Sequence, residues 1–304
     1  MKILVTGASG FVGRRFLEMA PASWEIICLG RSNIDYDDVK WVECDLSSKE
    51  SSKIAADVLA DKEFDVIVHL AAFVPKKPIE DSLEKCKEGN IDGTINLLTY
   101  FGKKAKKIII GSTVEAYDKT KISGPITEDN VVIGSSYYSS TKIASEVIAQ
   151  SFAQKNNKEL TILRFSIMYG GYDPIARAIP NFIRAAKSGD NLTINGPLVL
   201  RDYVHIDDVA SSIICAVNSA GAGVINIGTG RGVSIKETAE SIIKSMRSSS
   251  SINIMSDSGG CDIVIDISKA ESLLDYHPKV FFPDKIKEMG DLYENCKEKY
   301  IYRF

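Results

Sequence analysis

Short apolar runs alternate with longer stretches of helical periodicity through the first half of the chain. The runs are rich in β-branched residues and predict strands. These strands are Ile3–Val5, Glu25–Leu29, Trp41–Cys44, Val66–Leu70, Lys107–Ile110 and Leu160–Phe165. The stretches between them predict helices over Arg14–Met19, Lys49–Ala60, Asp81–Lys103 and Ser139–Lys155. Because strands and helices alternate, and runs such as VIVHL are apolar throughout, we expect a parallel sheet with helices on both faces.

The rhythm of the pattern changes after about Gly170. The second half predicts helices over Ile179–Ser188, Asp207–Ser219 and Ile235–Met246, and short strands over Val224–Ile227 and Ile263–Ile265. The four serines from Ser248 to Ser251 predict a loop. The expected fold is therefore α/β, with a Rossmann-type doubly wound parallel sheet over residues 1–170 and a smaller mixed α/β domain over residues 171–304.

A glycine-rich turn follows the first predicted strand, in the stretch MKILVTGASGFVG. Gly7 allows a tight turn, Gly10 lets the backbone approach a pyrophosphate, and Gly13 lets helix and strand pack closely. Phe11 and Val12 in this turn are also expected to contact the cofactor, and the helix that follows presents its N–H groups and the positive end of its dipole to phosphates. This turn predicts a dinucleotide site.

The spacing G-x-x-G-x-x-G resembles that of the short-chain dehydrogenase/reductase superfamily, and the next strand end bears on the choice of cofactor. Arg31 and Ser32 stand where an acidic residue often holds the adenosine ribose, and they favour the 2′-phosphate of NADP over NAD. Alternatively, Arg31 is a solvated loop charge, and Asp35 or another group serves NAD. Asp45, followed by Leu46, is placed to meet the adenine amino group, or else it is the N-cap of the following helix.

The candidate reacting group lies in the segment YSSTK. Tyr138 and Lys142 are four residues apart, so on a helix they lie side by side, whereas the equivalent partner of Tyr137 is Thr141. A phenol with a pKa near 10 is a poor base at neutral pH. A nearby ammonium and a positive nicotinamide ring lower that pKa, so that Tyr138 takes a proton from a sugar hydroxyl.

A pair of hydroxyl side chains, Ser112 and Thr113, ends the strand KIIIG. Ligands of α/β sheets bind beyond the carboxyl ends of the strands, so a hydroxyl there can contact the same oxygen as Tyr138. The alternative is an ordinary cap at the strand end.

Composition and charge exclude several classes of protein. The chain has 304 residues, 44% of them hydrophobic and 25% charged, with a net charge of −3, so nucleic acid is not an expected partner. We find neither an apolar run of membrane-spanning length nor a signal peptide, and no histidine spacing predicts a metal. The six scattered cysteines predict reduced, mostly buried thiols in a cytoplasmic protein.

Motifs along nearly the whole chain resemble an extended short-chain dehydrogenase/reductase of the NAD-dependent epimerase/dehydratase family. In order they are VTGASGFVG, CDL, VIVHLAA, NIDGTINLL, GSTVEAYD, PITED, YYSSTKIASE, LRFSIMYGG, RDYVHIDDVA, INIGTGRGVSIKETA and DISKAESLL. No single motif is decisive, but their combination and order are specific.

The resemblance implies a role for each matched residue. Thr113, Tyr138 and Lys142 are the catalytic set, the segment Leu70, Ala71 and Ala72 lines the cofactor, and Asn90 orders the neighbouring strand ends. Thr113, Val114 and Arg201 contact the nucleotide sugar, with Arg201 on its phosphate unless it pairs with Asp202 or Asp207. His205 is expected to be packed and hydrogen-bonded. The resemblance also implies that residues 171–304 mainly bind substrate and that helices 81–103 and 139–155 form a homodimer.

Three positions depart from the family pattern. Dehydratases of the family carry an Asp-Glu pair after the catalytic Thr, where this chain has Val114 and Glu115, so 4,6-dehydration is disfavoured. Ile167 replaces an Asn that helps to hold the diphosphate, and the stretch SDSGGCDIV has no counterpart of a second pocket Arg. The nucleotide is therefore held differently, or the substrate is not a standard UDP-sugar.

The leading hypothesis is an epimerase of a nucleotide-linked sugar that oxidises C4 transiently, with Tyr138 as base. The alternative is a one-way NADPH-dependent reductase of a nucleotide 4-keto sugar, which uses the same residues and which Arg31 and Ser32 favour. Another carbonyl or alcohol substrate is a third possibility. A non-catalytic nucleotide sensor has no need of Thr113, Tyr138 and Lys142.

Overall fold

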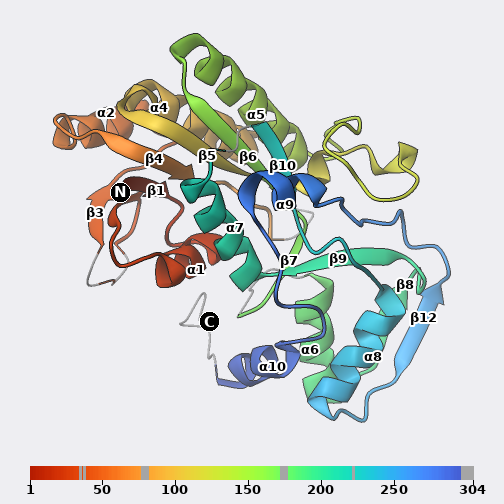
Figure 1. Ribbon diagram of the computed structural model, residues 1–304. Coiled ribbons are helices and arrows are strands. Elements are labelled where there is room, and N and C mark those ends of the chain that lie inside the picture. Colours follow the sequence, from red (N-terminus) through yellow and green to blue (C-terminus); the bar gives the residue numbers. More distant parts are fainter. Residues whose placement is uncertain (34–35, 37–38, 77–81, 172–176, 221–222, 296–304) are drawn as a thin grey trace.

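The computed structural model describes the chain except for residues 34–35, 37–38, 77–81, 172–176, 221–222 and 296–304. A seven-stranded parallel sheet lies between two layers of helices (Figure 1). Its strands are β1 (Lys2–Thr6), β2 (Glu25–Gly30), β3 (Lys40–Glu43), β4 (Phe64–His69), β5 (Ala105–Thr113), β6 (Glu159–Phe165) and β10 (Gly223–Ile227). The spatial order β3-β2-β1-β4-β5-β6-β10 is the doubly wound order of Rossmann folds, which confirms the predicted fold class.

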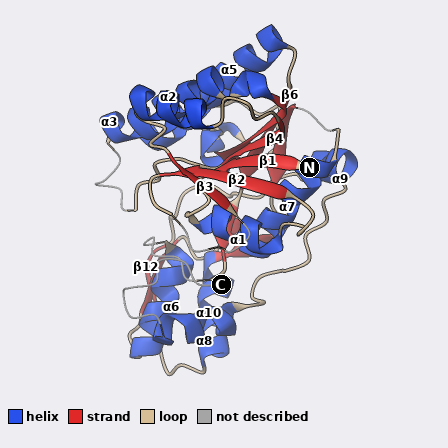
Figure 2. Ribbon diagram, turned by 90° about the vertical axis from the view of Figure 1, so that its left-hand side faces the viewer, coloured by secondary structure: helices blue, strands red, loops and turns tan. Residues whose placement is uncertain are grey.

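The helices cover both faces of the sheet. One layer holds α2 (Lys49–Val58), α3 (Leu83–Cys86), α4 (Gly93–Tyr100) and α5 (Tyr137–Asn156), and the other holds α1 (Phe11–Met19), α7 (Ile206–Asn218) and α9 (Ser268–Leu274). Figure 2 shows the first layer above the strands and α1 and α7 below them. In the described part of the chain, no helix is both long and apolar enough to cross a membrane.

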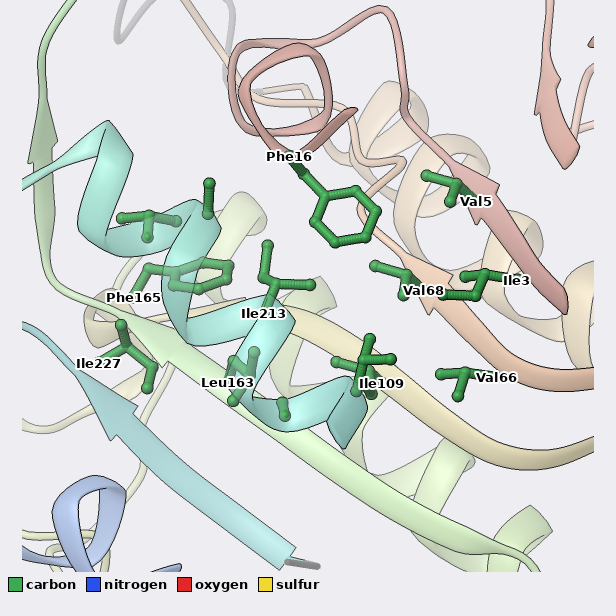
Figure 3. Packing of buried hydrophobic residues seen from close by; sticks show 14 of the residues in the cluster. Ile3, Val5, Phe16, Val66, Val68, Ile109, Leu163, Phe165, Ile213 and Ile227 are labelled. Carbon is green, nitrogen blue, oxygen red and sulfur yellow. The ribbon is translucent and has the colours of Figure 1, made fainter. Parts of the chain in front are cut away.

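The largest core cluster fills the space between the sheet and the layer of α1 and α7. Phe16 from α1 and Ile213 from α7 meet Val68, Ile109 and Leu163 from three adjacent strands (Figure 3). All five side chains are buried. Because these strands are apolar on both faces, similar clusters form under α2, α4 and α5. This packing fixes the strand ends that carry the candidate site.

The remaining elements form a smaller part beyond the carboxyl ends of the strands (Figure 2). They are β7 (Ile167–Tyr169), α6 (Ala178–Ser188), β8 (Leu192–Asn195), β9 (Leu200–His205), β11 (Gly232–Ser234), α8 (Ile235–Met246), β12 (Ile252–Ser256) and α10 (Ile286–Asn295). Strands β11, β9 and β7 form one small sheet, and β12 and β8 form another. The expected loop over the four serines after α8 is present.

Two expected elements differ from the structure. The strand expected over Ile263–Ile265 is a pair of isolated bridges, because Ile263 pairs with Arg201 whereas Ile265 pairs with Ile126. The long helix expected over residues 81–103 ends at Tyr100, and a π-helical segment, η2 (Lys87–Asp92), interrupts it. The second half of the chain also contributes β10, α7 and α9 to the large sheet and its cover.

Candidate active site

The glycine-rich turn connects β1 to α1 at the point where the strand order reverses. Gly7 has a φ of +73°, and a Cβ there would lie 2.5 Å from the backbone nitrogen of Ala71. A Cβ at Gly13 would lie 2.2 Å from the Gly7 carbonyl oxygen. Both glycines are therefore required by close backbone packing.

Gly10 differs from these two glycines. Its φ of −81° is ordinary, and it is the N-cap of α1. Apart from its chain neighbours, the only described heavy atom within 4 Å of an added Cβ would be the Gly7 carbonyl oxygen, at 3.1 Å. This leaves open space beside the first helical residues, Phe11 and Val12. A pyrophosphate fits a cradle of this kind, which a Cβ at Gly10 would partly fill.

Other residues predicted to hold the cofactor lie at the same edge of the sheet. Thr6, the last residue of β1, pairs with Leu29 on β2 and with His69 on β4. The residues that follow these two strands therefore lie beside the glycine-rich turn. They are Arg31 and Ser32, both exposed, and the segment Leu70–Ala72. The Thr6 hydroxyl accepts a hydrogen bond from the Ala71 N–H at 3.2 Å and contacts His69 Nδ1 at 2.7 Å. Asp35, the predicted alternative to Arg31, lies outside the described residues.

Asp45 makes a local turn rather than a helix cap. Its Oδ1 accepts hydrogen bonds from the N–H and the hydroxyl of Ser47, at 3.0 and 2.7 Å. The N-cap of α2 is Ser48, so the alternative role for Asp45 is wrong. Leu46 next to it is buried, and its carbonyl accepts from the Asn96 side chain at 2.8 Å. The contact of Asp45 with adenine stays a prediction.

Thr113, Tyr138 and Lys142 meet where β5 ends and α5 begins. Ser136 and Ser139 form a capping box that fixes the first turn of α5, which carries Tyr138. The Thr113 side chain lies near Tyr138 and lowers the pKa of its phenol. Lys142 follows one turn later on the same face and is 4% exposed. The structure therefore brings the predicted catalytic set together.

Burial dominates the protonation of this set. The pKa of Tyr138 is raised to about 12, chiefly by burial and in part by the charge of Glu115, while Arg177 and Thr113 act in the opposite direction. Burial also lowers the pKa of Lys142 to about 8. In the protein alone, burial disfavours the phenolate. The lowered tyrosine pKa expected from the sequence also requires the positive nicotinamide ring and stays a prediction.

Asn90 lies in η2 and joins three segments around this set. Its Oδ1 accepts from the Phe73 N–H at 2.7 Å, and its Nδ2 donates to the Thr141 hydroxyl at 3.0 Å. Its carbonyl accepts from Thr94 at 2.6 Å and from Ser145 at 2.8 Å. Asn90 thus holds the cofactor-side segment after β4 against the turn of α5 that carries Lys142.

Arg201 lies on β9 and donates to backbone carbonyls. Its Nη1 donates to Leu200 and Cys261, both at 2.8 Å, and its Nη2 donates to Gly259 at 3.3 Å. The alternative ion pairs are wrong. Asp202 accepts from Thr229 and Gly230 instead, and Asp207 pairs with Arg15 at 2.7 Å.

The remaining predictions concern smaller features. Val114 is 2% exposed, beside Thr113. His205 is buried, accepts from the Asp207 N–H at 3.2 Å and packs on Tyr169, as expected. Five of the six cysteines are described and are free thiols; Cys296 lies outside the described residues.

Sequence reasoning did not single out four residues close to the site: His69, Glu146, Arg164 and Arg177. Glu146 and Arg164 form a buried ion pair at 2.6 Å, and the charge of Arg177 acts on Tyr138. The only available signal was that Glu146 is an acid four residues after Lys142 on a helix.

Comparisons with known proteins agree with this geometry. A model of the NAD dependent epimerase/dehydratase family matches residues 3–228. The chain belongs to this family. Low-salt glycan biosynthesis protein Agl12 of Haloferax volcanii is a family relative that is 27% identical over 96% of this chain and 98% of its own. UDP-glucose 4-epimerase of Bacillus subtilis is also 27% identical, over 80% of this chain and 82% of its own.

The family's fold is also found among solved structures. The dTDP-glucose 4,6-dehydratase of Bacillus anthracis, in complex with NAD, has a TM-score of 0.83 and 25% identity, over 99% of this chain and 98% of its own. Together these findings confirm the family and the fold predicted from the sequence.

Proposed function

We propose that this protein is an NAD(P)-dependent epimerase of a nucleotide-linked sugar that acts by transient oxidation at C4. One observation carries the proposal: Thr113 lies near Tyr138 and acts on its pKa, and Lys142 is buried one turn away, at the sheet edge that holds the glycine-rich turn. The name of the Bacillus subtilis relative, UDP-glucose 4-epimerase, supports it.

Each residue of the set has a part in the proposed reaction. Thr113 donates a hydrogen bond to the C4 oxygen and orients it, and Tyr138 takes the proton of that hydroxyl. Lys142 stabilises the Tyr138 phenolate and holds the nicotinamide ribose. When bound, the nicotinamide supplies a positive charge near Tyr138 and a reversible acceptor for the C4 hydride, which returns to the other face once the keto sugar has turned. Tyr138 then returns the proton.

We propose that this site does not carry out 4,6-dehydration. Val114 is buried where dehydratases of the family carry an acid, so no side chain there can protonate a departing 6-hydroxyl. Arg201 directs two of its nitrogens to the carbonyls of residues 259–261, and its remaining donors are proposed to bind a substrate phosphate. We propose that residues 171–304 mainly supply this side of the site.

The alternative function is an NADPH-dependent reductase of a nucleotide 4-keto sugar. Arg31 and Ser32 favour it, because they are exposed at the end of β2, one strand from the glycine-rich turn, where a 2′-phosphate would lie. The NAD found with the Bacillus anthracis dehydratase supports a nicotinamide dinucleotide here and does not choose between NAD and NADP.

The bound dinucleotide distinguishes the two functions. The purified protein is denatured, and any released dinucleotide is identified by mass spectrometry. An epimerase regenerates its cofactor in each cycle, so near-stoichiometric NAD(H) or NADP(H) is expected. An empty site that binds NADPH much better than NADH would establish the reductase instead. No release and no binding of either would overturn the assignment of the glycine-rich turn.

Two further proposals concern assembly and location. Leu83, Ile95 and Val147 are exposed on α3, α4 and α5, and an apolar surface there supports a homodimer through these helices. Light scattering at several protein concentrations tests this. The free thiols of the described cysteines support a reducing compartment, the cytoplasm.

A further inference from the structure

Three ionisable side chains follow one another at intervals of four residues along one face of α5. Tyr138 is in the first turn, Lys142 follows, and Glu146 comes next. Side chains four apart on a helix are neighbours, so the Glu146 carboxylate flanks Lys142 on the side opposite Tyr138. Lys142 is 4% exposed and Glu146 is 3% exposed, so water screens this pair little.

The Glu146 carboxylate is fixed from two strands of the sheet. Its Oε1 accepts from the Ser112 hydroxyl on β5 and from Nε of Arg164 on β6, the latter at 3.0 Å. Its Oε2 accepts from Nη2 of Arg164 at 2.6 Å. Ser112 directly precedes Thr113, so the same carboxylate also bonds the strand end that carries Thr113.

The Arg164 guanidinium is buried between Glu146 and the ring of Tyr117. It lies 4.7 Å above the ring of Tyr117, and its Nη1 is buried without a hydrogen-bond partner among the described residues. The side of the guanidinium that faces Glu146 makes both of its hydrogen bonds to that carboxylate. Arg164 therefore holds Glu146 in one orientation beside Lys142.

The other ionisable groups near the pair do not replace Glu146. His69 on β4 is buried, and burial together with the charge of Lys142 lowers its pKa to about 3, so it is neutral. Glu115, in the short 3-10 helix η4 (Val114–Ala116), is partly exposed, and its Oε2 lies 2.6 Å from Nζ of Lys119. Cys86 on α3 raises the pKa of Tyr138 through its electrostatic interaction with that residue. Glu146 is thus the buried acid of this group, and it acts on Lys142 against the effect of burial.

We propose that Glu146 is a positioning residue: its fixed, buried carboxylate keeps Lys142 charged and directed at Tyr138, and orders the end of β5 through Ser112. The proposal rests on the proposed function only in that Lys142 assists proton transfer at Tyr138. Without Glu146, burial alone would govern Lys142, and its ammonium form would be lost at a lower pH.

The direct test measures the protonation of Lys142 without sugar or cofactor. Protein labelled at lysine Cε with carbon-13 is titrated by NMR, and the Lys142 signal is assigned from its absence in Lys142→Arg. In the unchanged chain we expect a pKa of about 8. In Glu146→Gln it should fall by about one unit, because a nearby opposite charge is worth one to three units. Turnover should then decline at correspondingly lower pH.

Two further variants separate charge from structure. Ser112→Ala removes one hydrogen bond to Glu146 and keeps its charge, so the Lys142 titration should stay in place. Glu146→Gln leaves Arg164 buried and unpaired and risks misfolding. The double variant Glu146→Gln with Arg164→Met removes both charges and is expected to fold. The pKa of Lys142 should still be lower in this variant than in the unchanged chain.

The outcomes distinguish this proposal from the proposed function. A Lys142 titration that does not move in Glu146→Gln or in the folded double variant would overturn the positioning role, whatever the enzyme does. A downward shift in a protein that turns over no nucleotide sugar would support the electrostatic role of Glu146 and contradict the proposed function alone.

Discussion

At the scale of single residues, burial determines the protonation states of Tyr138 and Lys142 before the reaction. The same desolvation raises the pKa of the phenol to about 12 and lowers the pKa of the ammonium to about 8, because both charged forms lose water. Near neutral pH the protein alone therefore holds a neutral Tyr138 beside a mostly charged Lys142. The positive nicotinamide is what the site still requires to favour the phenolate.

The pKa of Lys142 predicts the alkaline limb of the pH profile. The reaction requires Lys142 as an ammonium, and that form is lost as the pH rises through about 8. We therefore expect kcat to fall on the alkaline side of about pH 8, and we expect Lys142→Gln to be slow and to lack this limb. A profile that is still rising well above that pH would contradict the role of Lys142.

The glycines of the first turn predict two different phenotypes. A Cβ at Gly10 would enter the open cradle, so Gly10→Ala should weaken NAD(P) binding about tenfold, a loss of about 1.4 kcal/mol, with little change in Tm. A Cβ at Gly13 would collide with the Gly7 carbonyl oxygen and the Ala8 Cα, so Gly13→Ala should cost about 1–3 kcal/mol of stability. Titration calorimetry measures NAD(P) affinity, and thermal unfolding measures Tm. If both variants lost affinity and stability to the same extent, the separate roles of Gly10 and Gly13 would be refuted.

At the scale of elements, η2 shows how a helix is fitted to the site. The periodicity of residues 81–103 predicts one helix, but Asn90 bonds Phe73, Thr94, Thr141 and Ser145, and a π-helical segment runs through it. These bonds reach other elements, so no local pattern in the sequence predicts the interruption. A π-helical segment inside a helix is often found at a functional site.

The position of Asn90 predicts that its loss affects turnover as well as stability. Asn90→Ala leaves the half-buried Phe73 N–H without its acceptor and the buried Thr141 hydroxyl without its donor, and should cost about 1–3 kcal/mol of unfolding free energy. It should also lower kcat about tenfold or more, since Thr141 adjoins Lys142. Asn96→Ala is a matched control, because it removes a buried amide that bonds Leu46. Equal kcat in the two variants, at saturating cofactor, would show that Asn90 serves stability alone.

At the scale of the whole molecule, the sequence predicts the parts that depend on local pattern. The strand, glycine-rich turn and helix over residues 3–19 are consecutive, and Tyr138 and Lys142 share one helix, so periodicity locates both halves of the site. The pairing of β10 with β6 and the ion pair of Glu146 with Arg164 join distant segments. The protonation of Tyr138 depends on how deeply the assembled fold buries it. Such features follow from tertiary packing, which periodicity does not reveal.

The two functions proposed for the assembled site differ in where the hydride goes. An epimerase keeps the hydride within one active site, so the atom that leaves C4 returns to C4 of the same sugar. A reductase passes a hydride from an external cofactor to its substrate once per turnover. The fate of an isotopic label at C4 therefore distinguishes an epimerase from a reductase directly.

The measurement we would make first after cofactor analysis uses nucleotide sugars that carry deuterium at C4. UDP-glucose, UDP-N-acetylglucosamine, UDP-glucuronate and dTDP-glucose are incubated with the protein without added cofactor and followed by NMR. We expect at least one of them to form its C4 epimer with the deuterium retained at C4, and Tyr138→Phe to lose this conversion while it still binds the dinucleotide. No C4 epimer from any of these sugars, loss of the deuterium from C4 of the product, or equal conversion by Tyr138→Phe would contradict an epimerase that uses Tyr138 as its base.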